Sequence, residues 1–355
     1  MQKVKKVLSL IFIDGLSGMA LGLFATLIVG TIVGQIAGYI GGAFGGWMSS
    51  VASVAKAVTG AGIGVGVACK FKRPPLDVIS AAAVGMTGAF ASAILNGTLI
   101  DGGKVVFPGP GEPLGAFIAV IAAVGVGRLV SGKTKLDILL TPISMLAAGS
   151  AVGLLLGPPI SALMTGLGRF INWGTEQQPL VMGIVVSVVM GLCLTLPISS
   201  AAIGISLGLS GIAAGAAVVG CCCQMIGFAV SSYRENRLGG FFAQGIGTSM
   251  LQMPNIIKHP LIWIPPTLAS AILGPVATLL VKLPCNAIGS GMGTAGLVGP
   301  IMTYTEMSAA GEPVWYSLVI IAVMLIIAPA ALSLLFSELM RKLGWIKKGD
   351  MLLEI

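Results

Sequence analysis

The chain has 355 residues, of which 56% are hydrophobic and only 9% are charged, and its net charge is +8. A soluble domain carries about 25% charged residues, so the composition excludes a water-soluble protein and predicts one embedded in a lipid bilayer. The positive charge does not indicate a nucleic-acid partner, because the basic residues occupy short loops between apolar runs, where they determine membrane topology.

A helix needs about 20 apolar residues to cross the hydrocarbon core. Runs of this kind lie at 11–40, 47–69, 76–96, 114–131, 180–197, 204–230, 262–281 and 315–338. The first run follows the basic residues Lys3 to Lys6 and lacks a small-residue cleavage site. We therefore expect an uncleaved first span rather than a signal peptide.

Three other apolar stretches are interrupted. The connector at 136–179 contains Gly157-Pro158-Pro159, which we expect to divide it into a helix and a half-helix or into two short tilted helices. The stretches at 240–256 and 284–304 are rich in glycine and too short or too broken to cross, which predicts two re-entrant or broken segments. The sequence thus predicts an all-α, polytopic integral membrane protein with about 8–10 transmembrane helices.

Orientation follows from the basic residues. If the connector crosses the bilayer zero times or twice, all but three of the 20 Lys and Arg residues face one side; the exceptions are Lys56, Lys104 and Lys282. If it crosses once, the basic residues divide equally between the two sides. The positive-inside rule favours the first arrangement, with both termini in the cytoplasm.

An internal repeat is indicated by two echoes in the same order. Gly111-Glu112-Pro113 and Gly311-Glu312-Pro313 each precede an apolar run, and Lys72-Arg73-Pro74-Pro75 has a counterpart in Lys258-His259-Pro260. We expect a single membrane domain, 1–355, made of a first half at 1–135, the connector at 136–179 and a second half at 180–355. Parallel halves imply a two-fold axis along the membrane normal, with a site between them.

Two glycine motifs do not indicate nucleotide binding. The stretch 127–134 matches the phosphate-loop pattern, but that chemistry needs a preceding strand and here an apolar span precedes it, so a basic loop explains it. Gly62-Ile63-Gly64-Val65-Gly66 predicts close helix packing. In Gly289-Ser290-Gly291-Met292-Gly293, which follows Asn286 and precedes Thr294, converging backbone amides are expected to bind a hydroxyl or an anion, or to line a pore.

The strongest concentration of polar side chains lies between residues 224 and 255. It comprises Gln224, Glu235, Asn236, Gln244, Thr248, Ser249, Gln252 and Asn255. Amides and hydroxyls suit a neutral polyol, which needs paired hydrogen bonds without strong charge. A solvated cytoplasmic loop is the alternative, and it applies most directly to Arg234 through Arg237. Glu306, just past the second glycine-rich stretch, is either an intramembrane functional carboxylate or part of an extracellular loop.

The sequence shows no catalytic or metal site. With His259 as the only histidine, no Ser-His-Asp set can be assembled, and the six cysteines lack metal-ligand spacing. Cys221-Cys222-Cys223 lies in an apolar run and is interpreted as small hydrophobic packing. We therefore expect no cofactor.

Several motifs resemble a known family. They are Leu194-Thr195-Leu196-Pro197-Ile198-Ser199-Ser200, Gln224-Met225-Ile226-Gly227-Phe228, Ser232-Tyr233-Arg234-Glu235-Asn236, Gln244-Gly245-Ile246-Gly247-Thr248-Ser249-Met250-Leu251-Gln252 and Gly291-Met292-Gly293-Thr294. The chain resembles the second IIC-type permease family of the phosphotransferase system, which also includes a membrane regulator of the toxin perfringolysin O. The resemblance implies a sugar permease of the bacterial plasma membrane, a homodimer, and phosphorylation supplied by separate IIA and IIB proteins.

Three functions are left open. The first is a IIC-like permease that moves a small polar, sugar-like solute by alternating access, with Gln244, Thr248, Gln252, Asn286 and Glu306 binding its hydroxyls. The second is a membrane-embedded solute sensor or transcriptional regulator without net transport, recruiting a cytoplasmic partner through 232–240 or 341–355. The third is a proton- or sodium-coupled carrier that uses Glu306 or Asp14.

Overall fold

The computed structural model describes residues 10–107, 109–133 and 136–353, and they form two compact units that divide after Leu163. The basic residues Lys3 to Lys6, Thr134 of the phosphate-loop pattern and the last two residues of 341–355 lie outside the described residues. Apart from a two-stranded hairpin, every described element is helical, which confirms the all-α prediction. Here η marks a short π- or 3₁₀-helical stretch.

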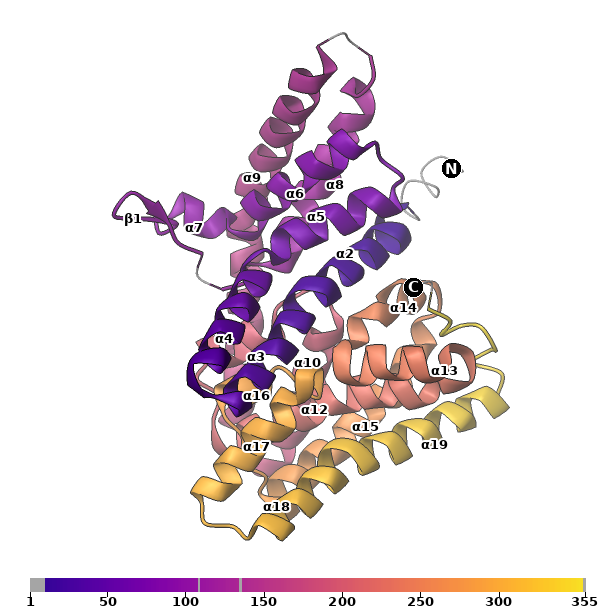
Figure 1. Cartoon of the computed structure of the whole chain (residues 1–355). Coiled ribbons are helices and arrows are strands. Elements are labelled where there is room, and N and C mark those ends of the chain that lie inside the picture. Colours follow the sequence, from indigo (N-terminus) through magenta and orange to yellow (C-terminus); the bar gives the residue numbers. More distant parts are fainter. Residues whose placement is uncertain (1–9, 108, 134–135, 354–355) are drawn as a thin grey trace. The chain divides into compact units, whose positions relative to one another are not determined.

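In the first unit, helices pack closely against one another at glycine residues. Its elements are η1 (Leu10–Gly15), α2 (Leu16–Leu23), η2 (Phe24–Ile28), α3 (Val29–Ile40), α4 (Gly42–Ala57), α5 (Thr59–Lys70), α6 (Pro75–Ala89), α7 (Ala91–Leu95), β1 (Ile100–Asp101), β2 (Lys104–Val105), α8 (Pro113–Val130) and the first part of α9 (Asp137–Thr175) (Figure 1). A Cβ atom at Gly62 would lie 2.9 Å from the Gly22 carbonyl oxygen of α2. The predicted close packing of the 62–66 glycines is confirmed, because small residues let helix backbones approach in lipid.

The second unit carries most of the polar side chains. Its elements are the last part of α9, α10 (Pro179–Thr195), α11 (Ser200–Ser206), α12 (Gly211–Ser231), α13 (Tyr233–Phe242), η3 (Ala243–Gly247), η4 (Ser249–Gln252), α14 (Met253–Lys258), η5 (Pro260–Trp263), α15 (Ile264–Pro275), η6 (Val276–Val281), α16 (Ala287–Ser290), η7 (Ala295–Leu297), α17 (Val298–Ala309), α18 (Val314–Ile321), η8 (Ala322–Ile327) and α19 (Ala328–Lys342). α12 forms its centre, packed against α10, α15 and α19, and is buried along almost its whole length.

Six stretches of the described residues are long and apolar enough to cross a membrane, or seven if the bent pair α4 and α5 counts as one span. The 47–69 run is this pair, with a 51° bend. The 76–96 and 180–197 runs contain the shorter helices α6 and α10. The predicted polytopic membrane fold is confirmed, with six to seven candidate spans among the described residues where the sequence predicts 8–10.

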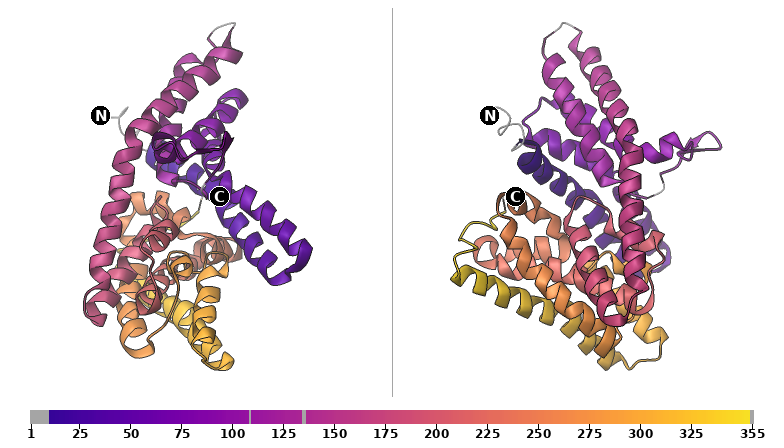
Figure 2. Two further views of the ribbon diagram at one scale, coloured as in Figure 1. Left: turned by 90° about the vertical axis from the view of Figure 1, so that its left-hand side faces the viewer. Right: turned by 180° about the vertical axis from the view of Figure 1, so that it is seen from behind.

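The predicted break in the connector is wrong. α9 runs without interruption for 39 residues, with Pro158 and Pro159 inside it (Figure 2). Each proline removes one backbone donor, but unwinding the chain in lipid would leave many more groups unpaired, so the intact helix is favoured. One continuous helix also removes the premise of zero or two crossings, so the cytoplasmic placement of both termini stays a prediction.

The two echoes of the repeat share local conformation. Gly111 and Gly311 both adopt positive φ, at +74° and +81°, and helices begin at Pro113 and just after Pro313. Glycine tolerates this left-handed backbone and proline suits a helix start. The division into halves at 1–135 and 180–355 stays a prediction.

Candidate functional site

A first re-entrant segment, residues 243–258, comprises η3, η4 and α14. It begins beside the end of α12, where Gln244 Nε2 donates to the Ser232 hydroxyl over 2.9 Å. Its tip is Thr248–Ser249, and the Ser249 hydroxyl lies 2.8 Å from the Thr195 hydroxyl, which in turn bonds Gln224. Gln224 lies about two helical turns back from the end of α12. The segment therefore dips into the unit and returns, as predicted for 240–256.

A second re-entrant segment, residues 282–309, enters from the other end of α12. Cys285 N donates to the Gly211 carbonyl over 3.1 Å, at the start of α12. Further along the segment, the Thr294 hydroxyl lies 3.6 Å from the Met225 sulfur, about 20 Å along α12 from Gly211. The chain then returns through α17 until Glu306 meets Asn286. This path confirms the prediction of a re-entrant or broken segment at 284–304.

The tips of the two segments meet beside the middle of α12. η3 packs against η7, and Gly293 adopts a φ of +53° where its backbone lies against Cys221. A Cβ atom at Gly293 would lie 2.9 Å from the Cys221 Cβ, so only glycine fits there. In Figure 1, α13 and α14 lie towards one end of α12 and α16 and α17 towards the other.

A largely buried group of polar side chains occupies this meeting point, and we call it the central cluster: Thr195, Gln224, Thr248, Ser249, Trp263, Thr267 and Thr294. Five of them form one hydrogen-bonded network, whereas Thr248 bonds Met250 N and Thr294 bonds Met225. Gln224 is fully buried at its centre. Its Oε1 accepts from Thr195 over 3.2 Å and from Trp263 Nε1 over 3.0 Å, while its Nε2 donates to Thr267 over 3.2 Å. Every polar atom of this amide is thus paired, as a buried amide requires.

Local sequence explains how the central cluster is positioned. α10 ends at Thr195 because Pro197 follows two residues later. Thr248 is extended, and its hydroxyl accepts from Met250 N, so it caps η4 and turns the tip. Of the predicted residues, Gln224 and Ser249 are therefore joined through Thr195, Thr248 lies next to Ser249 at the tip, and Thr294 contacts α12 at Met225.

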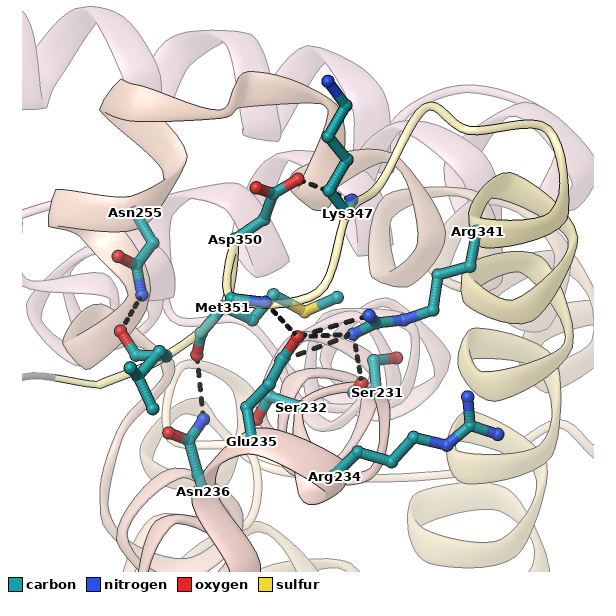
Figure 3. A network of polar contacts seen from close by, with 12 residues as sticks. Ser231, Ser232, Arg234, Glu235, Asn236, Asn255, Arg341, Lys347, Asp350 and Met351 are labelled. Atoms are coloured by element: carbon teal, nitrogen blue, oxygen red, sulfur yellow. Dashed lines mark hydrogen bonds and ion pairs between the residues drawn. The ribbon is translucent and has the colours of Figure 1, made fainter.

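The remaining predicted residues of the tract lie elsewhere, at the end of α12 where basic residues gather, which we call the basic-end group: Glu235, Asn236, Gln244, Gln252 and Asn255. All but Gln244 contact a segment that follows α19, residues 346–353 (Figure 3), and Gln244 bonds Gln252. The Glu235 carboxylate also forms an ion pair with the Arg341 guanidinium at 3.2 Å. Both side chains are nearly buried, with 3% of Glu235 and 12% of Arg341 exposed. These residues are neither a solvated loop nor part of the central cluster.

Asn286 and Glu306 form a third group at the opposite end. Asn286 Nδ2 donates to Glu306 Oε1 over 3.2 Å, and Asn286 Oδ1 accepts from Gly289 N. Both side chains are half-buried. Backbone amides in this stretch bond locally, for example Gly299 N to the Gly293 carbonyl over 2.8 Å.

All three groups lie in the part of the chain that matches one known protein family. A family model described as "Phosphotransferase system, EIIC" matches residues 13–353. The chain belongs to this family. No curated protein matches it significantly. This EIIC chain is therefore a multi-pass membrane permease of the phosphotransferase system, and the family implies association with IIA and IIB components.

Sequence reasoning missed three members of the central cluster in this EIIC chain: Thr195, Trp263 and Thr267. Thr195 belongs to a motif that carries the family resemblance, and Trp263 and Thr267 lie in an apolar run in which nothing marks them as partners of Gln224. The signal that could have found them is a hydrogen-bonding side chain inside a membrane span, which needs a partner. Among the described residues, no cluster of His, Cys, Asp or Glu could hold a metal ion.

Proposed function

We propose that this EIIC chain binds a small, sugar-like polar solute at the central cluster and moves it by alternating access across the bacterial plasma membrane. The observation that carries the proposal is the meeting of two re-entrant segments, from opposite ends of one unit, at a buried polar network. Transporters place their solute sites near the bilayer midplane, where interrupted helices leave polar groups inside the protein.

The chemistry of the central cluster suits a polyol. Its side chains are amides and hydroxyls, each able to donate and accept, with an indole N–H as a further donor. Gln224 and Ser249 are fully buried and bond within the protein, so the structure represents a closed state. A solute hydroxyl can replace an internal partner with little net change in free energy, because one hydrogen bond is exchanged for another.

Alternating access assigns a role to each re-entrant segment. Withdrawal of 243–258 opens the central cluster towards the basic end, and withdrawal of 282–309 opens it towards the end that holds Asn286 and Glu306. Those two half-buried side chains are our candidates for first contact with the solute on that side. Arg234, Lys258 and Arg341 mark the basic end as cytoplasmic by the positive-inside rule.

Transport and phosphorylation are divided between proteins in this proposal. Separate IIA and IIB proteins supply the phosphoryl group at the cytoplasmic side, and the EIIC chain acts as a homodimer. No residue of the chain is assigned a catalytic role.

The test is uptake into proteoliposomes of a panel of radiolabelled hexoses, disaccharides and polyols. Thr195→Val removes the hydroxyl that links Gln224 to Ser249 while preserving the side-chain shape. Thr278→Val is the matched control, because Thr278 is also buried but bonds the Pro179 carbonyl, away from the cluster. We expect uptake to fall about tenfold or more in Thr195→Val alone. Equal uptake by the two variants would refute the central site.

A solute sensor without net transport is the second candidate, and the complete internal pairing of the Gln224 amide favours it. Thermal stabilisation of the purified protein by one sugar of the panel, with no uptake of that sugar, would support sensing instead of transport.

A further inference from the structure

Residues 346–353 form a segment without helix or strand that is held mainly through its own backbone (Figure 3). Asn236 contacts it with both ends of its amide: Nδ2 donates to the Met351 carbonyl and Oδ1 accepts from Leu353 N, each over 2.8 Å. One side chain thus binds the carbonyl of one residue and the N–H two positions later. This pairing binds the main chain on either side of Leu352, directly after a turn at residues 348–351, rather than a particular side chain.

Three more side chains bind the backbone of the segment, and His259 Nδ1 lies 3.6 Å from Oδ1 of its Asp350 side chain. Gln252 Nε2 donates to the same Met351 carbonyl over 3.0 Å, and Asn255 Nδ2 donates to the Leu352 carbonyl over 2.9 Å. Glu235 Oε1 accepts from Gly349 N over 3.0 Å. Of the side chains of the segment, Ile346 and Met351 are buried, at 2% and 0% exposed, whereas Lys347, Lys348 and Leu352 are exposed.

The groups that bind the segment are fixed by one another. Gln252 Nε2 also donates to Gln244 Oε1 over 2.8 Å, and Asn255 Nδ2 donates to Gln252 Oε1 over 2.8 Å. Gln244 is held in turn by the Gly240 carbonyl and Ser232. These bonds between the amides do not involve the segment, and a binding site held by its own contacts lowers the entropic cost of binding.

We propose that Glu235, Asn236, Gln252 and Asn255 form a peptide-binding groove for a segment that carries a turn followed by a long, unbranched apolar side chain. Domains that bind extended peptides work in this way: main-chain hydrogen bonds supply affinity and a pocket supplies selectivity. The occupant is residues 346–353 of the same chain, with Met351 in the pocket.

The bound segment is also a strap on the first re-entrant segment. Gln252 and Asn255 belong to the limb of 243–258 that returns from the tip, whereas Glu235 and Asn236 belong to α13, so the occupied groove ties the returning limb to α13. Release of the strap frees the tip at Ser249 to withdraw from the central cluster. This step rests on the proposed function, whereas the groove itself does not.

The test uses the full chain with Met351→Asp, which expels the segment and leaves the groove residues unchanged. A fluorescent peptide with the sequence of residues 346–353, IKKGDMLL, is added, and binding is followed by anisotropy. We expect binding to the variant and at least tenfold weaker apparent binding to the unsubstituted chain, whose own segment competes at high effective concentration. The same peptide N-methylated at its last leucine, which loses the donor to Asn236, should bind about tenfold more weakly.

Two results would overturn the groove: absence of peptide binding to a folded Met351→Asp chain, or equal affinity for the N-methylated peptide. If the variant does not fold, hydrogen exchange of the unsubstituted chain decides, since Gly349 and Leu353 amides must exchange far more slowly than in the free peptide. For the strap, residues 243–252 should exchange faster in Met351→Asp and uptake should rise. Peptide binding with unchanged exchange of 243–252 refutes the strap, whereas absence of uptake by every variant refutes the proposed transport alone.

Discussion

Replacing Gly220 with alanine tests the backbone contact between α10 and α12. A Cβ atom at this position would lie 2.7 Å from the Ser187 Cα and closer still to the Ser187 carbonyl group. Carbon atoms in contact are normally about 3.5–4.0 Å apart, so α10 must retreat by roughly 1 Å. That shift also weakens the bond from the Ser187 hydroxyl to the Ser270 carbonyl, now 2.8 Å long.

The size of the effect follows from opposing contributions. Overpacking costs about 1–3 kcal/mol and a weakened buried hydrogen bond about 1 kcal/mol. The better helix propensity of alanine returns about 1 kcal/mol. The net loss is about 2 kcal/mol, which lowers the melting temperature by on the order of 5 °C.

The assay is thermal unfolding of the protein in lipid nanodiscs, followed by tryptophan fluorescence. Gly125→Ala is the control, because Gly125 also lies inside a helix, α8, but has no atom within 4 Å of an added Cβ. We expect this control to melt at or slightly above the temperature of the unsubstituted protein. A Gly220→Ala variant that melts as high as Gly125→Ala would refute the reasoning.

Three further predictions concern charge and access. Glu235→Ala leaves Arg341 nearly buried without its counter-charge and should cost about 3 kcal/mol, whereas Glu338→Ala breaks only the more exposed pair with Arg234 and should cost under about 1 kcal/mol; chemical denaturation measures both. Burial raises the pKa of Glu112, in the loop before α8, from 4.5 to about 7. Its folded state therefore favours the neutral acid, so stability is highest below about pH 4.5 and falls as the pH rises through 7, by up to about 3 kcal/mol. Melting curves at pH 5 and pH 8 should lose this difference in Glu112→Gln, and an unchanged difference would contradict the assignment. Maleimide should label Cys69 alone in the folded protein, because the other five cysteines are buried; labelling of a second cysteine before denaturation would show that the buried set opens.

The sequence alone was sufficient for the membrane class and for both re-entrant segments. A low content of charged residues indicates a chain surrounded by lipid. Apolar runs that are broken by glycine are too short to span the bilayer as one helix. The sequence could not show that α9 continues through Pro158 and Pro159, because local helix-breaking tendency competes there with the cost of unpaired backbone in lipid.

The polar tract was located correctly along the chain but not divided correctly in space. Gln244 and Gln252 bond each other near the basic end, while Ser249, which lies between them in sequence, reaches Thr195 at the tip. A segment that turns back on itself separates near neighbours and joins residues eight positions apart. Asn236 bonds the Met351 carbonyl, 115 residues further along the chain, and no periodic pattern in the sequence predicts this contact.

The glycine contacts within the second unit have a mechanical consequence. Gly183 on α10 meets Pro275 on α15, and Gly191 on α10 meets the Gly220 carbonyl on α12, each with 2.7 Å between an added Cβ and the nearest backbone atom. Helices that touch main chain to main chain cannot slide or roll past one another without collision. We therefore expect α10, α12 and α15 to move as one rigid body. Conformational change in this unit is then confined to the two re-entrant segments that pack against these helices.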